Sequence, residues 1–354
     1  MVQGSTPSDD AARRRNAWLQ AQRRGRRGVW IRNVVRHRAV WALPAYVLLA
    51  LWLIGVIYRL FLQDRLPGLF AYPYYALPPV VLTILPIVAS VCWLIAGKRR
   101  IAVGALTAGM LCGCWAYATT WFHHTPVTSP QGTRRVLFWN ISHGEAGFER
   151  IVDEIRTHNP DIIAVVESSP PGNPTMAEAR VIVAQMEEFW SEHLPEYDAY
   201  VSVTGITTLA RNGLKYRCYV QLFNGWAIHC EVPIEGTSLH LVVADVAASL
   251  SGSRASPLLN LYEHLDTLAE QPVVVVGDFN TPADSVYFDP LRLTFRNAFE
   301  TAGNGYAATW PLPIPLLTLD QAWISDQLSV SQCSLGWSRL SDHRPIILDI
   351  SLAP

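Results

Sequence analysis

Three long apolar stretches in the first third of the chain constrain its fold more than any other feature. They cover residues 39–58, 75–96 and 101–122, and none contains a charged residue. Each is about 20 residues long, enough for a helix to cross a hydrocarbon core of roughly 30 Å. We therefore predict three transmembrane helices, which also explain why only 16% of the 354 residues are charged.

The first apolar stretch could instead belong to a cleaved signal peptide. The segment before it, residues 1–38, is too long for that role, no small-residue cleavage site is evident, and two more apolar stretches follow. A transporter is disfavoured too, because ion and substrate paths through a membrane usually place charged residues inside the spans. We interpret residues 39–122 as a membrane anchor.

The charge of the chain is divided between its two parts. Up to Pro126 there are 15 basic and 3 acidic residues, a net charge of +12, and beyond it 13 basic and 26 acidic residues, a net charge of −13. Ten of the basic residues are arginines of the leader, residues 1–38, and three form the turn Lys98-Arg99-Arg100. Basic flanks of membrane helices face the cytoplasm, which predicts a cytoplasmic leader and a C-terminal domain on the outer side. The alternative, a leader that binds nucleic acid, is less favoured because a basic segment next to a span usually sets topology and contacts anionic lipid.

After a linker containing Pro and Gly at residues 123–133, strand and helix patterns alternate to the end of the chain. Apolar runs typical of buried strands are separated by apolar residues at helical spacing. About 220 residues of this kind suit one domain of two packed sheets with outer helices. Strands are expected at 136–140, 162–166, 239–243, 273–276 and 346–350, and helices at 148–158, 177–194 and 258–269.

A β-hairpin is expected over residues 216–232, because Asn224-Gly225 separates two strand-like runs. A two-residue turn at that dipeptide places Cys218 opposite Glu231 rather than Cys230. A disulfide between the two cysteines would need a bulge and is therefore disfavoured. No cysteine spacing in the chain matches a zinc motif.

Polar residues follow the ends of several of the predicted buried strands. A single acidic residue in such a place is often only a cap, but several of them together with a His-Asp pair indicate a metal-assisted site along one edge of a sheet. The residues concerned are Asn140, Glu167, Asp278, Asn280, Asp320, Asp342 and His343.

The segments that carry these residues resemble the endonuclease/exonuclease/phosphatase superfamily, which has the deoxyribonuclease I-like fold. They occur in the family order and span residues 134–354; GDFN and SDHRP together are the most specific part. The resemblance implies an α+β domain, a four-layer α/β/β/α sandwich that hydrolyses phosphate esters with Mg²⁺ or Mn²⁺ as cofactor. The matching segments are LFWN (137–140), NPDIIAVVE (159–167), GDFNT (277–281), LD (319–320) and SDHRP (341–345).

Three of the candidate residues are expected to hold the metal. Mg²⁺ prefers hard oxygen ligands and keeps several of its waters, so one or two carboxylates suffice. Glu167 is the main ligand expected, with Asn140 nearby and Asp342 as a further one.

The other four candidates are expected to act on the phosphate ester. The imidazole of His343 titrates near neutral pH, which suits a general base or an acid–base partner of the phosphoryl group. By the resemblance, Asp320 orients this histidine. Asp278 would position or deprotonate the nucleophile, and Asn280, a neutral donor, would hold a phosphoryl oxygen.

Two positions depart from the family pattern. Many members have a histidine in the strand that reads LVVADV here, where this chain has Asp245. A carboxylate repels a phosphate unless it is protonated or bound to a metal, so the site is either weakened or served by a second metal. In GITTLAR (205–211), Ala210 replaces a serine that often precedes the arginine. Arg211 and Asp245 are candidate substrate-binding residues, with a plain surface charge as the alternative for Arg211.

The charge of the domain bears on its substrate. Nucleic-acid binding relies on basic surfaces that neutralise phosphates, and residues 127–354 have a net charge of −13. A membrane anchor favours instead a membrane partner: a phospholipid, or a phosphate or pyrophosphate linked to a lipid. An extracytoplasmic nuclease or nucleotide phosphodiesterase is the first alternative, and a non-catalytic envelope binding protein is the second.

Overall fold

The computed structural model describes residues 40–66, 68–125, 127–128, 130, 132–172, 174–249 and 254–354. The predicted basic leader lies outside these residues. The chain divides into two compact units, which we name the anchor unit (Met1–Val56 with Val81–Gly113) and the sandwich unit (Ile57–Val80 with Cys114–Pro354).

Among the residues that the structure describes, two helices are long and apolar enough to cross a membrane, where the sequence predicted three. They are Val40–Leu62, which ends in the π-helical turn η1 (Tyr58–Leu62), and α4 (Arg99–Thr120). Between them, α3 (Pro79–Ile95) has 17 residues, or about 25 Å of helix. A third span would require α3 and the bent segment Gly68–Ala76 to act as one span, although 69° separates their directions.

Two prolines explain why the middle helix is shorter than predicted. Pro78 and Pro79 lack the N–H that a helix interior needs, and two such residues in a row favour the start of a helix, whereas the single Pro86 is tolerated inside α3. The residues before them form separate short helices, η2 (Gly68–Ala71) and α2 (Tyr72–Ala76).

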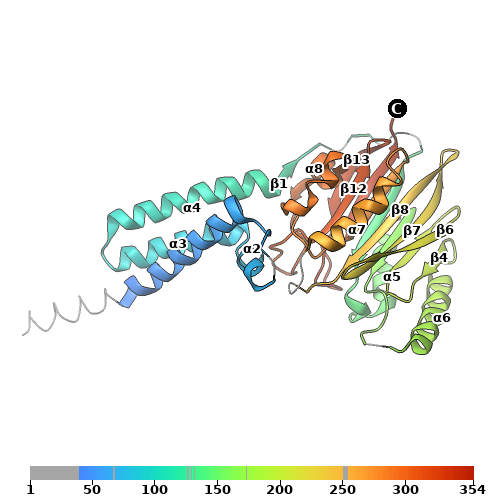
Figure 1. Ribbon diagram of the computed structural model, residues 1–354, viewed down its shortest axis with the longest axis horizontal. Coiled ribbons are helices and arrows are strands. Elements are labelled where there is room, and N and C mark those ends of the chain that lie inside the picture. Colours follow the sequence, from blue (N-terminus) through green and yellow to red (C-terminus); the bar gives the residue numbers. More distant parts are fainter. Residues whose placement is uncertain are drawn as a thin grey trace, which may run out of the picture. The chain divides into compact units, whose positions relative to one another are not determined.

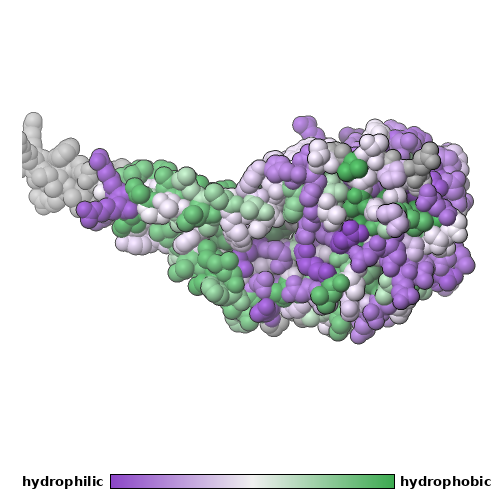
Figure 2. All heavy atoms as spheres, turned by 90° about the horizontal axis from the view of Figure 1, so that it is seen from above, coloured by the Kyte–Doolittle hydropathy of each residue, from purple (hydrophilic) through white to green (hydrophobic). Residues whose placement is uncertain are grey.

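The helices of the anchor unit expose large apolar side chains and pack through small ones. Leu43, Met110 and Leu111 are each more than 60% exposed, and hydrophobic residues cover much of this part of the molecule (Figure 2). A Cβ at Gly109 would lie 2.6 Å from the Ile87 side chain, so α3 and α4 approach each other where only glycine fits. Small residues at helix crossings and apolar outer faces are typical of membrane helices.

The sandwich unit contains two six-stranded sheets (Figure 1). Sheet I has the strand order β13-β14-β2-β3-β5-β4, and sheet II has the order β10-β12-β9-β8-β7-β6. The strands of sheet I are β2 (Arg134–Asn140), β3 (Ile162–Val166), β4 (Asp198–Val201), β5 (Thr207–Ala210), β13 (Leu328–Leu335) and β14 (Ile346–Leu352). Those of sheet II are β6 (Lys215–Leu222), β7 (Gly225–Ile234), β8 (Thr237–Val246), β9 (Val273–Asp278), β10 (Phe295–Asn297) and β12 (Asp320–Ser325).

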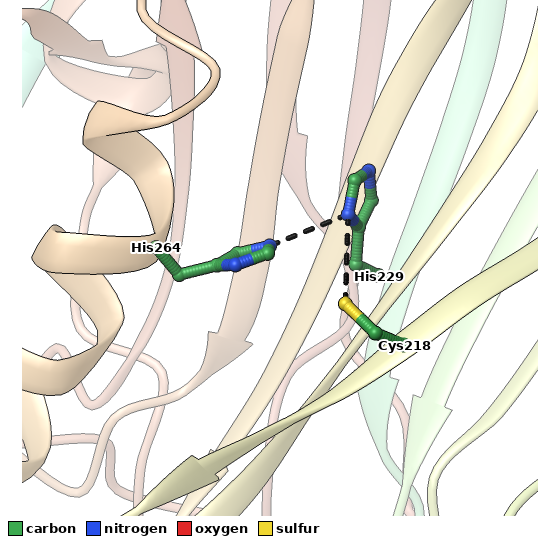
Figure 3. Close-up of side chains that lie close together, drawn as sticks. All are labelled: Cys218, His229 and His264. Atoms are coloured by element: carbon green, nitrogen blue, oxygen red, sulfur yellow. Dashed lines mark hydrogen bonds between the residues drawn. The ribbon is translucent and has the colours of Figure 1, made fainter.

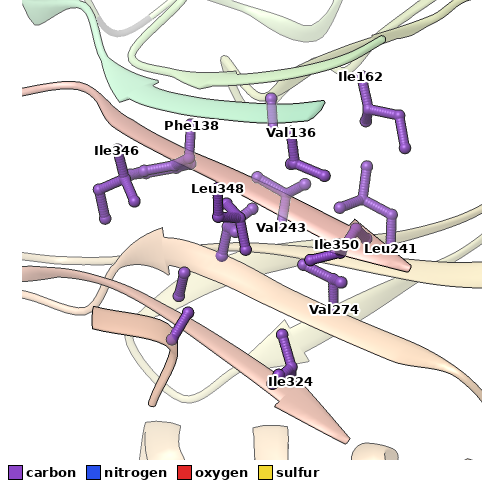
Figure 4. Packing of buried hydrophobic residues seen from close by; sticks show 14 of the residues in the cluster. Val136, Phe138, Ile162, Leu241, Val243, Val274, Ile324, Ile346, Leu348 and Ile350 are labelled. Carbon is purple, nitrogen blue, oxygen red and sulfur yellow. The ribbon is translucent and has the colours of Figure 1, made fainter. Parts of the chain in front are cut away.

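The side chains of these strands alternate between two apolar layers. In β2, Val136 and Phe138 point into the core between the sheets (Figure 4), whereas Leu137 and Trp139 pack in a second cluster with the helices on the outer face of sheet I. Sheet II repeats the pattern, with Val274 in the central core. The outer helices are α5 (Phe148–His158) and α6 (Met176–His193) on sheet I and α7 (Ala255–Asp266) on sheet II. This arrangement confirms the predicted α/β/β/α sandwich.

The hairpin differs from the prediction by one residue. Leu222 pairs with Gly225, so the turn is Phe223-Asn224 rather than Asn224-Gly225, and a bulge in β6 leaves Cys218 opposite His229. Gly225 is the first residue of β7. Only glycine fits there, because a Cβ would lie 2.3 Å from the carbonyl oxygen of Asp245. Cys218 and Cys230 are both free thiols.

Polar contacts hold residues 57–80 together and join them to Asp284 and Ser285 of the same unit. The guanidinium of Arg59 donates to the carbonyl oxygen of Tyr74 (2.7 Å), lies over the Tyr74 ring and pairs with Asp284. The carboxylate of Asp64 accepts from the hydroxyl of Ser285. Both partners lie just after the GDFN segment. Directly after α4, β1 (Trp121–His123) pairs with β11 (Asn304–Tyr306) in a short two-stranded ribbon.

Candidate active site

The ends of five strands bring the candidate residues together. β2 and β3 run parallel, as do β8 and β9, so each pair presents its carboxyl ends at one edge. Asn140 ends β2 and Glu167 follows β3; Asp278 ends β9 beside Asp245 on one neighbouring strand and Asp320 on the other.

Asn140 links the two sheets. Its Nδ2 donates to Oε1 of Glu167 and to Oδ2 of Asp278, both at 3.0 Å. Its Oδ1 accepts the backbone N–H of Ser142 at 2.9 Å, which fixes the orientation of the amide. Asn140 thereby holds one carboxylate from each sheet at a single point.

His343 and Asp320 form a buried pair. Nδ1 of His343 lies 2.8 and 3.0 Å from the carboxylate oxygens of Asp320, and its Nε2 points toward Asp278, 3.9 Å from Oδ2. Asp320 is itself held by its backbone N–H, which donates to the hydroxyl of Thr309. With its Nδ1 side occupied, the imidazole presents Nε2 to the site.

Burial and mutual repulsion shift the acid–base properties of the site. Burial and the neighbouring Asp320 raise the pKa of Asp278 to about 7. Burial, Asp278 and Glu167 raise the pKa of Asp245 to about 8. Burial opposes a charged imidazole at His343, but Asp320 and Asp278 outweigh it and raise the pKa to about 10. The site therefore favours a protonated His343, and Asp278 and Asp245 take up a proton more readily than ordinary carboxyl groups.

The donor set fits a divalent cation. Four carboxylates gather at this edge with one imidazolium to offset them, and an excess of buried negative charge is stabilised by a bound cation. Carboxylate oxygens are the ligands that Mg²⁺ and Mn²⁺ prefer. Three of the residues, Asp278, Asp320 and His343, have donor atoms within 4.8 Å of one another. Glu167 lies on the more open side, with its side chain 30% exposed.

Several residues of the site have positive φ although they are not glycine. Glu167 (φ 49°) and Asn280 (φ 46°) follow β3 and β9, and His143 (φ 56°) follows β2. This conformation turns the backbone sharply at the end of a strand, and it costs free energy for residues with a Cβ. The turn after β9 directs the Asn280 amide to the carbonyl oxygen of Val246 (2.8 Å), on the neighbouring strand.

The segment before β14 is supported from sheet I. Trp139 donates from its indole to the carbonyl oxygen of His343, and the hydroxyl of Ser341 joins the carbonyl oxygen of Asn140 to the N–H of His343. Asp342 accepts a hydrogen bond from the indole of Trp310 (2.9 Å) and lies 4.0 Å from Nε2 of His343. Asp342 therefore lies on the histidine side of the site.

Of the residues predicted from the sequence, Arg211 lies away from the site, and the sequence analysis did not identify His143, which lies at it. Arg211 follows the end of β5 that pairs with Ile162, the first residue of β3, and it contacts Asn159 and the Tyr197 ring. Glu167 is at the other end of β3, about 15 Å along the strand. The missed residue is His143, whose Nε2 lies 3.3 Å from Oε2 of Glu167; its closeness to LFWN was the one signal in the sequence.

The fold is that of a class of sandwich proteins whose members generally hydrolyse phosphate esters. The chain belongs to the endonuclease/exonuclease/phosphatase family, whose profile matches residues 137–343, more than half of its length. A comparison with curated proteins finds no significant sequence match.

Several solved structures have a similar fold. The catalytic domain of human Nocturnin, with bound sulfate, is 19% identical with a TM-score of 0.50 over 66% of this chain and 98% of that domain. An endonuclease/exonuclease/phosphatase from Beutenbergia cavernae is 18% identical (TM-score 0.49; 63% and 72% covered). A mannosyl-6-phosphatase from Bacteroides thetaiotaomicron is 13% identical (TM-score 0.48; 62% and 100% covered). At these identities, the likeness concerns the fold alone.

Proposed function

We propose that this protein is a membrane-anchored phosphoesterase that depends on a divalent metal and hydrolyses a lipid-linked phosphate or pyrophosphate or a phospholipid. The observation that carries the proposal is the continuous set of contacts from Glu167 through Asn140 and Asp278 to the His343–Asp320 pair. A purely structural cluster would not need five buried or half-buried polar side chains at one sheet edge.

Each residue has a role that follows from its position. Glu167, with Asn140 and Asp342 as further candidates, would hold Mg²⁺ or Mn²⁺, which when bound stabilises the charge that develops on the phosphoryl oxygens. Asp278, with a pKa near neutrality, would orient the attacking water and take its proton.

The histidine side of the site would act on the phosphoryl and leaving groups. Protonated His343 would hold a phosphoryl oxygen or give its proton to the leaving oxygen, and Asp320 would keep the imidazole charged and oriented. Asn280 would add a neutral donor. A protonated Asp245 would spare an incoming phosphate from repulsion.

The surroundings of the site favour a substrate with an apolar part. A groove next to the site is lined by Leu312, Pro313, Trp337 and Leu340 and reaches Asp342. Trp337 is 58% exposed, although large apolar side chains are usually buried. The acidic charge of the domain disfavours long polyanions.

The topology that we propose follows from the basic flanks of the spans. A cytoplasmic leader and three crossings, with Gly68–Ala76 and α3 forming the middle one, would place residues 121–354 on the outer side. A C-terminal alkaline phosphatase fusion should then be active. Fluorescence of a C-terminal green fluorescent protein without phosphatase activity would contradict this topology.

A substrate panel tests the function. Full-length protein in detergent with Mg²⁺ is offered an isoprenyl pyrophosphate, a phospholipid and DNA, and phosphate or headgroup release or strand cleavage is measured. We expect turnover of a lipid substrate that His343→Ala abolishes and the control His158→Ala, at the end of α5, leaves intact. Cleavage of DNA alone would overturn the lipid proposal, and absence of any turnover would favour a binding protein.

A further inference from the structure

A second polar cluster lies between sheet II and α7, apart from the strand ends that form the active site. Cys218 comes from β6, His229 from β7 and His264 from α7 (Figure 3). The three donor atoms all lie within 4.8 Å of one another. The cluster interrupts an apolar interface, because the same face of α7 buries Leu258, Leu261 and Leu265 against the sheet.

Two groups converge on one nitrogen. Nδ1 of His229 lies 3.3 Å from Nε2 of His264 and 4.0 Å from Sγ of Cys218, and Figure 3 shows both groups pointing at it. A neutral imidazole nitrogen has one lone pair or one proton, so it cannot form good hydrogen bonds with both partners. The separation of the two nitrogens, 3.3 Å, also exceeds the usual hydrogen-bond length of about 2.9–3.0 Å.

The same distances fit a shared cation. For Zn–N bonds of 2.0–2.1 Å and a Zn–S bond of 2.3 Å, a tetrahedral site separates two nitrogens by about 3.3 Å and nitrogen from sulfur by about 3.6 Å. The observed separations are 3.3 and 4.0 Å. A shift of a few tenths of an ångström in Cys218, which is half-buried, would bring its Sγ to the expected distance from Nδ1 of His229.

His240 contacts the ring nitrogen of His229 that faces away from the cluster. Nε2 of His229 lies 2.9 Å from Nδ1 of His240, which in turn lies 4.0 Å from Oε1 of Glu231. Donation from Nε2 of His229 to His240 leaves the lone pair of Nδ1 directed at the cluster. Such an outer partner is typical of histidines that ligate metals.

Burial favours the neutral form of the three histidines, which is the form that binds metals. Burial, followed by the neighbouring histidines, lowers the pKa of His229 to about 4, and burial also lowers the pKa of His240 and His264. Burial raises the pKa of the Cys218 thiol, so a metal would have to displace its proton.

We propose that Cys218, His229 and His264 bind a thiophilic transition-metal cation such as Zn²⁺, with His240 as a positioning residue. Three protein ligands of this type leave one tetrahedral position for water or another donor. The site is separate from the catalytic one in its elements and in its chemistry, since nitrogen and sulfur select transition metals and oxygen selects Mg²⁺.

Co²⁺ tests the proposal, because a thiolate bound to Co²⁺ gives a charge-transfer absorption that an oxygen site does not. Metal-stripped full-length protein is titrated with Co²⁺ in excess Mg²⁺, and Zn²⁺ is then added to displace it. We expect one equivalent of the thiolate band, its loss in Cys218→Ala and its retention in Cys114→Ala, a cysteine in α4. His240→Ala should weaken Zn²⁺ binding by about 10–100-fold.

His264→Ala gives an independent check, because His264 is half-buried on a helix and its replacement should leave the fold intact. It should abolish tight Zn²⁺ binding while the Mg²⁺-dependent turnover of the protein persists, so this proposal and the proposed function can fail separately. No thiolate band in the folded parent protein, or equal Zn²⁺ affinity in Cys218→Ala, would overturn the site.

Discussion

Replacement of Arg59 should destabilise residues 57–80, because this side chain contacts Tyr74 and Leu77 within the segment and Asp284 outside it. The side chain of Arg59 is 1% exposed and donates to the carbonyl oxygens of Tyr74 (2.7 Å) and Leu77 (3.4 Å), with its guanidinium 4.0 Å from the centre of the Tyr74 ring. Arg59→Ala removes all of these contacts and leaves two carbonyl groups without this donor.

The expected loss follows from the individual contacts. One good charge-assisted hydrogen bond contributes about 1.5–3 kcal/mol, and a desolvated cation–π contact about 1–2 kcal/mol. The ion pair with Asp284 adds little, because the Asp284 side chain is 53% exposed and water screens it. Because contacts that share one side chain are not fully additive, we expect Arg59→Ala to destabilise the unit by about 2–4 kcal/mol.

Thermal unfolding of the full-length protein in detergent measures this effect. For a unit of this size the loss corresponds to a fall in Tm of roughly 4–16 °C. Asp284→Asn is the matched control and should cost less than about 1 kcal/mol. Limited proteolysis should cut residues 57–80 faster in Arg59→Ala. Equal Tm values and equal cleavage for Arg59→Ala and its parent would refute the stabilising role of Arg59.

Three further outcomes follow from the site. Asp320→Asn should lower turnover by about 10²–10⁴-fold, as loss of a carboxylate that orients a catalytic histidine does, without loss of the fold by circular dichroism; parental activity would exclude the role given to His343. Gly277→Ala should destabilise the protein by about 1–3 kcal/mol, because its Cβ would lie 2.4 Å from the carbonyl oxygen of Ala244. Denaturant unfolding measures this loss. The control Gly104→Ala, at a position where nothing lies within 4 Å, should change stability little. Chelation with EDTA should abolish turnover and added Mg²⁺ should restore it, and activity that survives full metal removal would contradict a metal-dependent reaction.

The central strands were predictable because burial leaves a direct trace in sequence. The strand at 162–166 and the helix at 148–158 match β3 and α5 residue for residue, since uninterrupted β-branched runs and helical spacing are strong signals. The short strands β10 and β12 were not identified as strands, because β10 has only 3 residues and the run of β12 begins with two polar ones.

Features that depend on distant contacts could not be predicted. Arg59 and Asp284 are 225 residues apart, and no local pattern marks a loop between apolar helices as part of another unit. The cluster of Cys218, His229 and His264 also has no motif spacing, because a bulge in β6 and the packing of α7 bring its members together. In the active site, strand ends identified the carboxylates, but register alone decides that Arg211 lies at the opposite end of the sheet.

The positive φ angles of Glu167 and Asn280 have a consequence for how this protein responds to selection. Glycine would adopt either conformation without the cost of about 1–2 kcal/mol that a Cβ imposes, so a screen for heat resistance should accept glycine at these two positions. A screen for turnover should reject it, because glycine has neither a carboxylate nor an amide. Positions where the two screens disagree would outline the active site.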